Sequence, residues 1–220
     1  MNKEREAIAI DGPAASGKSS TAKAVARELG YRHVDSGSLY RAATAARLRR
    51  DSDSASWTED SVLDAARSVT LSPVENGFVP LLNGRPADNE MRGEAVTNRV
   101  SVVAKMPRVR EWVNTQVRNV GRDHDVVVDG RDMGTVVFPD AKLKIFLVAA
   151  PEERARRRVL ERAGREPTEE ELFDETARIL LRDELDAPQS VKAADAVEID
   201  TTTLTQPEQI EQIVKLARNH

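Results

Sequence analysis

The segment Gly12-Pro13-Ala14-Ala15-Ser16-Gly17-Lys18-Ser19 follows an apolar run, Ala7–Ile10, and precedes a helical pattern. In that pattern Ala22, Val25 and Leu29 recur at helical spacing, and Gly30 is placed to end the helix. The segment matches the phosphate-binding pattern G-x-x-x-x-G-K-[ST] at every fixed position. Strand, glycine-rich loop and helix in this order predict the opening of a parallel α/β unit.

Glycines at both ends of such a loop let backbone N–H groups turn inward around phosphate oxygens, and the following helix adds its partial positive charge. We expect Lys18 to reach the β- and γ-phosphates and the Ser19 hydroxyl to ligate Mg²⁺. The alternative is a glycine-rich turn without a ligand, which the flanking strand and helix disfavour. The residues expected to bind ATP in this segment are Gly12, Pro13, Ala14, Ala15, Ser16, Gly17, Lys18, Ser19 and Ser20.

Further apolar runs extend the α/β pattern. Val126–Val128 and Lys144–Val148 are typical of strands that are buried on both faces of a parallel sheet. Ala196–Ile199 predicts a last strand, and Pro207–Arg218 a closing helix. Asp129 ends one of these strands and is expected to lie at the metal, although a turn formed with Gly130 is an alternative interpretation.

Two segments depart from this alternation. Residues 69–86 hold two β-like runs separated by Asn76-Gly77, which predicts an antiparallel hairpin, interpreted as a small inserted lobe. Glu152–Asp186 is highly charged and helical in character, with an interruption near Gly164–Pro167, and predicts a helical hairpin.

The composition narrows the function classes. The formal net charge is −4 and only 4% of the residues are aromatic, so we expect no nucleic-acid partner, and local Arg and Lys clusters must hold any anion. There is no cysteine, which excludes disulfides and thiolate chemistry. The apolar run Ile145–Ala150 is too short to cross a membrane, and residues 1–6 lack the pattern of a signal peptide, so we expect a cytoplasmic protein.

Two polar segments should lie beside the phosphate loop. Asp35–Arg41 and Arg131–Pro139 both follow predicted strands, and open α/β sheets bind ligands at the carboxyl ends of their strands. They predict a second anion site. The three histidines, His33, His124 and His220, belong to no motif and are expected to be ordinary structural or surface residues.

At this point the chain resembles the bacterial-type cytidylate (CMP) kinases, a family of nucleoside monophosphate kinases. The resemblance rests on Ile10-Asp11-Gly12-Pro13 with its loop, Asp35-Ser36-Gly37 with Tyr40-Arg41, Pro107-Arg108-Val109-Arg110, Asp129-Gly130-Arg131-Asp132-Met133-Gly134-Thr135-Val136-Val137-Phe138-Pro139, and Asp195-Ala196 with Asp200-Thr201-Thr202. These segments run in the family's order over nearly the whole chain. The resemblance implies a P-loop NTPase core with a parallel sheet flanked by helices, an inserted antiparallel β lobe and a helical lid.

The resemblance also implies roles for individual residues. The acceptor nucleotide would be bound by Ser36, Tyr40, Arg41, Ser101, Arg110, Asp132 and Asp186. Arg131 and Arg182 would act with Lys18 in phosphoryl transfer, and Arg154 and Arg158 would contact ATP. Many relatives have an arginine three residues beyond the aspartate at 186, where this chain has Gln189, so one cationic contact to CMP is expected to be missing or replaced.

The sequence thus predicts a single domain, residues 1–220, with its core at 1–36, 105–152 and 193–220, a monophosphate-binding insert at about 37–104 and a lid at about 153–192. We expect a monomeric enzyme that uses ATP and Mg²⁺ to phosphorylate CMP and dCMP. The alternatives are a kinase for another monophosphate and a nucleotide-dependent switch. No Asn-Lys-x-Asp segment supports a GTPase.

Overall fold

The computed structural model describes residues 5–220. The prediction that residues 1–6 are not a signal peptide therefore falls partly, at residues 1–4, outside the described residues. Seven strands form one sheet in the order β3-β4-β2-β5-β1-β6-β7. They are β1 (Ala7–Asp11), β2 (Arg32–Asp35), β3 (Val69–Val74), β4 (Gly77–Leu82), β5 (Val126–Gly130), β6 (Leu143–Val148) and β7 (Val197–Asp200). Neighbouring strands are parallel except β3 and β4, which are antiparallel. The predicted fold class is confirmed.

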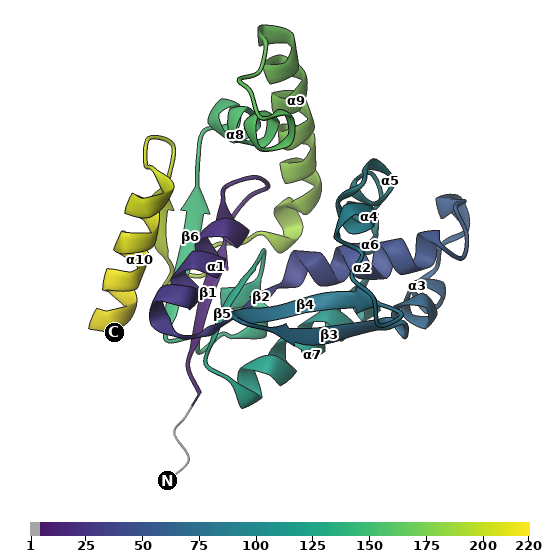
Figure 1. Ribbon diagram of the computed structural model, residues 1–220, viewed down its shortest axis with the longest axis horizontal. Coiled ribbons are helices and arrows are strands. Elements are labelled where there is room, and N and C mark those ends of the chain that lie inside the picture. The colour runs from purple at the N-terminus through teal and green to yellow at the C-terminus, as the bar shows by residue number, and fades with distance from the viewer. Residues whose placement is uncertain (1–4) are drawn as a thin grey trace.

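Helices cover both faces of the sheet (Figure 1). The four main ones are α1 (Lys18–Leu29), α2 (Ser36–Leu48), α7 (Pro107–Asp123) and α10 (Gln206–Asn219). On one face Ile8 of β1 joins a buried cluster with Val25 of α1 and Ile213 of α10. On the other face Ala9 joins a cluster with Val113 of α7. Since successive side chains of a strand point to opposite faces, β1 must be apolar on both, as a central parallel strand is.

The segment between β2 and α7, residues 37–104, is called the insert. Besides most of α2 and the β3–β4 hairpin, it contains α3 (Glu59–Ala66), α4 (Asp88–Arg92), α5 (Glu94–Thr97) and α6 (Val100–Val103). The hairpin is antiparallel as predicted, but β4 also pairs in parallel with β2, so the hairpin extends the main sheet. Gly77 allows this approach, because a Cβ there would lie 2.4 Å from the carbonyl oxygen of His33.

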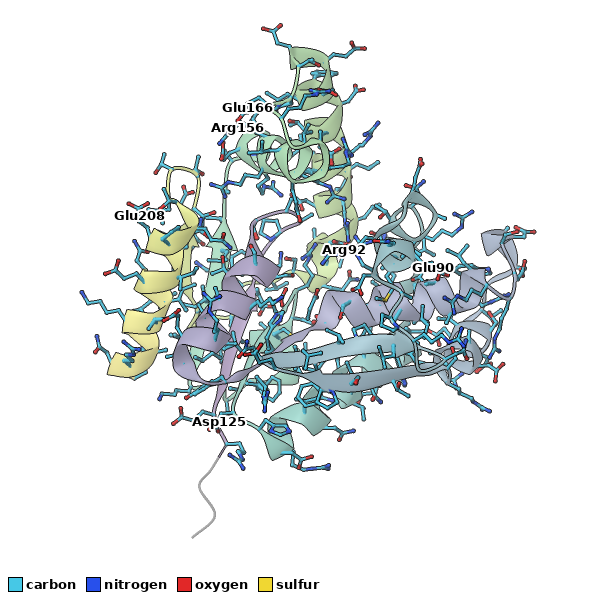
Figure 2. The ribbon with its side chains drawn as sticks, in the orientation of Figure 1. Glu90, Arg92, Asp125, Arg156, Glu166 and Glu208 are labelled. Atoms are coloured by element: carbon cyan, nitrogen blue, oxygen red, sulfur yellow. The ribbon has the colours of Figure 1, made fainter. Side chains whose placement is uncertain are left out.

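The second departure from the α/β alternation is the lid, residues 153–192. Its helices α8 (Pro151–Ala163) and α9 (Glu169–Asp186) form the predicted hairpin, which rises from the sheet in Figure 1. Gly164 ends α8 with a φ of 68°, and the Thr168 side chain accepts a hydrogen bond from the Glu171 N–H at the start of α9. Figure 2 shows Arg156 and Glu166 close together at this turn, where they form an ion pair of 2.9 Å.

Among the described residues, 5–220, no helix is both long and apolar enough to span a membrane.

Candidate active site

The strand order brings three loop segments together. β1 lies between β5 and β6, and β5 lies between β1 and β2. In the register Asp35 of β2 stands opposite Asp129 of β5, and Asp11 of β1 stands opposite Gly130. Because the carboxyl ends of parallel strands lie at the same edge, the loop after β1, the loop after β5 and the start of α2 meet there.

The phosphate loop has the backbone that its glycines predict. Gly12 and Gly17 have φ values of 148° and 86°, and Ala15 has a φ of 56°, which is uncommon for a residue with a side chain. Lys18 is buried, and its Nζ donates to the carbonyl oxygen of Pro13 and to the Ser16 hydroxyl at 3.3 Å. The lysine is therefore folded back over the loop.

Burial lowers the pKa of Lys18 well below its usual value, and the positive charge of Arg131 lowers it further. Two partly buried guanidinium groups nearby also have lowered pKa values. Burial and the positive charge of Arg131 lower the pKa of Arg182 to about 10. Burial and the positive charge of Arg158 also lower the pKa of Arg41. Each positive charge here makes it less favourable for its neighbours to stay protonated. A polyanionic ligand bound between these groups would offset that repulsion.

Arginines from five separate segments contribute to this cluster, which consists of Arg41, Arg92, Arg131, Arg158 and Arg182. Figure 2 shows Arg92 of α4 on the side of the insert nearer to α9. Arg92 was not among the residues expected from the sequence, since nothing in its local pattern distinguishes it from a solvated surface arginine. The packing of α4 against α2 within the insert brings its charge near Arg41.

Lid carboxylates bind several of the groups expected to hold phosphates. Asp183 accepts a hydrogen bond from the Ala14 N–H at 2.9 Å and pairs with Arg154 at 2.6 Å. Arg154, which is 4% exposed, also donates to the carbonyl oxygen of Ala14 at 2.8 Å. Asp186 accepts from Arg131 at 3.1 Å and 3.2 Å. In this structure carboxylates therefore bind a loop amide and an arginine that would face phosphate oxygens.

A second region, beside α2, gathers most of the residues expected to bind the acceptor. Arg110 pairs with Asp132, and its guanidinium lies 5.9 Å from the centre of the Tyr40 ring. Arg41 donates to the carbonyl oxygen of Met91 at 3.0 Å and to the Thr97 hydroxyl at 3.1 Å. The Tyr40 hydroxyl is buried and has no hydrogen-bond partner among the described residues. A buried hydroxyl without a partner is costly, so it is available to a ligand.

The remaining candidates are placed as follows. The Ser36 hydroxyl donates to the carbonyl oxygen of Asp129 at 2.9 Å, which fixes the start of α2 against β5. Ser101 is half-buried on α6. Ser20 is exposed and donates to the carbonyl oxygen of Gly17 at 3.0 Å. Arg158 of α8 pairs with Glu175 of α9 at 3.0 Å, so in this structure it links the two helices of the lid. Gln189 ends a short 3₁₀ turn after α9.

Ser19 and Asp129, the two expected metal ligands, lie together. The Ser19 hydroxyl donates to Asp129 Oδ2 at 2.5 Å. One hydroxyl and one carboxylate suit Mg²⁺, which prefers oxygen ligands and usually keeps several waters while it binds substrate phosphates. Among residues 5–220 no cluster of three or more His, Cys, Asp or Glu could form a protein-only metal cage. The residues present therefore fit a magnesium ion that arrives with a nucleotide.

Two further residues at this edge were missed by the sequence interpretation. His33, expected to be an ordinary residue, lies with Nε2 2.7 Å from Asp129 Oδ1. Burial by itself lowers the pKa of His33, but the hydrogen bond and charge of Asp129 outweigh it and raise that pKa. Asp11 accepts the N–H groups of Met133 at 2.9 Å and Gly134 at 2.8 Å, and so fixes the loop that carries Arg131. Asp11 could have been found from its place at the end of a predicted core strand, whereas the local sequence gives no such signal for His33.

Known proteins are similar to this chain over nearly its whole length. A protein-family profile described as "Cytidylate kinase" matches residues 8–219. A cytidylate kinase of Geobacillus kaustophilus (strain HTA426) is 46% identical over 222 residues, which cover 97% of each chain. One of Bacillus cereus (strain G9842) is 42% identical over 221 residues, covering 97% of this chain and 96% of its own. A solved structure of an uncharacterized protein from Eubacterium ventriosum, 13% identical, covers 98% of this chain and 99% of its own with a TM-score of 0.52, a likeness of fold alone.

Proposed function

Because the chain belongs to the cytidylate kinase family, we propose that the protein transfers the γ-phosphate of ATP to CMP, giving CDP and ADP. The observation that carries this proposal is a phosphate loop beside a separate, arginine-lined acceptor region at one edge of the sheet. We extend the proposal to dCMP on the family resemblance. Two anion sites at one edge suit a reaction between two phosphorylated substrates.

In the transfer, a phosphate oxygen of CMP forms a bond to the γ-phosphorus, and the bond from that phosphorus to the oxygen bridging to the β-phosphate breaks. The acceptor oxygen is already ionised near neutral pH, since the second pKa of a phosphate monoester is about 6. The reaction therefore needs no strong general base, and the protein acts by aligning the two anions and stabilising their charge.

We propose that the loop Gly12–Ser20 and Arg154 bind ATP. Lys18, Arg131 and Arg182 would stabilise the negative charge on the phosphoryl group during its transfer. Guanidinium groups suit this task because their planar fork binds phosphate oxygens in pairs. Ser19 and Asp129 would hold Mg²⁺, whose positive charge, when it is bound, offsets that of the phosphates. Arg158 would reach ATP only after it leaves Glu175.

We assign CMP to the region beside α2, with Ser36, Tyr40, Arg41, Ser101, Arg110 and Asp132 as binding residues and Asp186 at the ribose. The insert would carry the acceptor toward the core, and the lid would cover the reacting groups. Covering them favours transfer to CMP over transfer to water. As ATP and the acceptor bind, their phosphates would displace the carboxylates of Asp183 and Asp186 from the loop amide and from Arg131.

We also propose that the protein acts as a monomer in the cytoplasm, where ATP and CMP are available, and that it binds no nucleic acid. The formal net charge of −4 and the small aromatic content support the last point, because sequence-independent binding of single strands uses basic grooves and stacking rings.

The test is to mix the purified protein with ATP and Mg²⁺, add CMP, dCMP, UMP, AMP or GMP in turn, and follow the release of ADP. We expect release that depends on CMP or dCMP. If UMP, AMP or GMP causes the greatest release, the protein is a kinase for that monophosphate and not for CMP. Steady release without any acceptor would indicate a nucleotide-hydrolysing switch and contradict the proposal.

A further inference from the structure

His33 makes a contact that its own segment of sequence does not suggest. It is the second residue of β2, and its Nε2 lies 2.7 Å from Oδ1 of Asp129 on the neighbouring strand β5. The side chains of His33 and Asp129 are 13% and 2% exposed. An ionised carboxylate can only accept hydrogen bonds, so His33 is the donor.

The two oxygens of the Asp129 carboxylate have different partners. Oδ1 accepts from His33, and Oδ2 accepts from the Ser19 hydroxyl at 2.5 Å. The torsion that rotates a carboxylate has a broad, shallow preference, so the aspartate alone would not fix which oxygen faces Ser19. A donor on Oδ1 removes this freedom and directs Oδ2 to the position beside Ser19.

The need for such a donor is increased by Asp35. This aspartate stands opposite Asp129 in the strand register. Two carboxylates that face each other on adjacent strands repel when both are ionised. The hydrogen bond from His33 helps to hold Asp129 in place against that repulsion.

We propose that His33 is a positioning residue for the nucleotide-bound magnesium ion. It acts through Asp129, whose Oδ2 it directs toward the Ser19 hydroxyl, and it touches neither substrate. This inference rests on the magnesium site in the proposed function. Residues that hydrogen-bond to metal ligands in this way commonly change metal affinity by about 10- to 100-fold when they are removed.

The test compares the binding of ADP with and without Mg²⁺ by calorimetry. His33→Phe keeps a flat ring and removes the donor, and His33→Gln keeps an N–H donor. We expect His33→Phe to weaken ADP binding in the presence of Mg²⁺ by about 10-fold. ADP binding in EDTA should not change, and His33→Gln should recover most of the loss. Unchanged binding in EDTA also shows that the variant still folds around an intact phosphate loop.

His124→Gln is the matched control, because His124 directly follows α7, away from this edge, and its ring centre lies 5.4 Å from that of Phe78. A second measurement uses Asp129→Asn. If His33 acts through Asp129, removing His33 from the Asp129→Asn variant should cause no further loss of Mg²⁺-dependent binding.

Equal weakening of ADP binding with and without Mg²⁺ in His33→Phe would overturn the inference, because it would show a purely structural role. Unchanged binding in both conditions would also overturn it. If the unsubstituted protein binds ADP equally well with and without Mg²⁺, the proposed magnesium site is contradicted, and so is the positioning role of His33. That outcome is distinct from the first two, in which the original protein responds to Mg²⁺.

Discussion

Gly12 lies where two backbone segments come unusually close. A Cβ at this position would stand 2.2 Å from the carbonyl oxygen of Leu147 on β6, and the φ of Gly12 is +148°. A side chain here would push the start of the phosphate loop away from the sheet. Gly30 makes a useful comparison, because its φ is +71° but nothing lies within 4 Å of its Cβ position.

We therefore expect Gly12→Ala to lower ADP affinity by about 10-fold or more, since displacing the loop amides costs well over 1.4 kcal/mol of binding free energy. Gly30→Ala should leave ADP affinity unchanged and lower the free energy of unfolding by about 1 kcal/mol, because it adds only backbone strain. Calorimetry measures the first quantity and urea denaturation the second. Similar ADP affinities in the two variants would contradict this account of the loop.

Arg41 offers a test of the acceptor region at the scale of one side chain. It is partly buried, contacts the insert at Met91 and Thr97, and lies near other cations. Arg41→Ala should raise the KM for CMP by about 10-fold, because losing a charged hydrogen bond costs binding free energy equivalent to about that change in affinity. The KM for ATP should stay close to its original value. Initial-rate kinetics with each substrate varied in turn would measure both.

The control for this variant is Arg49→Ala, which removes an exposed ion pair with Glu90, labelled in Figure 2, at the end of the same helix. We expect both KM values of this control to be unchanged, because exposed pairs contribute little. An equal rise of the two KM values in Arg41→Ala would show that the acceptor region has been assigned wrongly.

At the scale of elements, a buried carboxylate links the two helices of the lid. Glu175 of α9 pairs with Arg158 of α8 at 3.0 Å, with Arg162 of α8 at 3.4 Å and with Arg178 of its own helix at 3.5 Å. A carboxylate shared by two helices links them, and the arginines remain partly solvated. The link lies across the hairpin, so it stabilises the lid without involving the core.

Glu175→Gln keeps the shape of the side chain and removes its charge. We expect the stability of the α8–α9 hairpin to fall by about 1–3 kcal/mol, the usual range for a lost charged hydrogen bond. Faster amide hydrogen exchange confined to α8 and α9 would report this. Glu184→Gln, at an exposed position of the same helix, should not change exchange there. Equal exchange in both variants would contradict the role of Glu175.

At the scale of the whole molecule, one sheet edge carries two anion regions that different segments build. The donor region comes from the loop after β1 and from the lid, and the acceptor region comes from α2, the insert and α7. Because Lys18 belongs only to the first region, the two nucleotides should bind separably. A ligand at about 100 times its Kd stabilises a protein by about 2.7 kcal/mol, which raises the Tm of a chain this long by about 5–10 °C.

Lys18→Met should therefore lose most of the rise in Tm caused by ADP and keep the rise caused by CMP. Differential scanning fluorimetry with each nucleotide measures both. Lys23→Met, at an exposed position of the same helix, should keep both rises. If Lys18→Met loses the two rises together, the regions are not separate and the division of the site is wrong.

The sequence by itself determined the features that depend on neighbours along the chain. The phosphate loop needs only its glycines, Lys18 and the flanking periodicity, and the lid hairpin needs only its helical pattern and the turn at Gly164. Both were predicted close to their observed bounds, and so were the central strands β5 and β6. Short-range sterics and hydrophobic periodicity decide such elements, so local patterns suffice.

Contacts between distant segments were decided by the tertiary structure alone. His33 reaches Asp129 across 96 residues because β2 pairs with β5, and Asp183 reaches Ala14 across 169 residues because the lid lies over the loop. The pairing of β4 with β2 and the approach of Arg92 to Arg41 are of the same kind. Strand order and helix docking are set by burial of apolar surface throughout the chain, so a histidine in a short strand gives no local sign of the carboxylate it will meet.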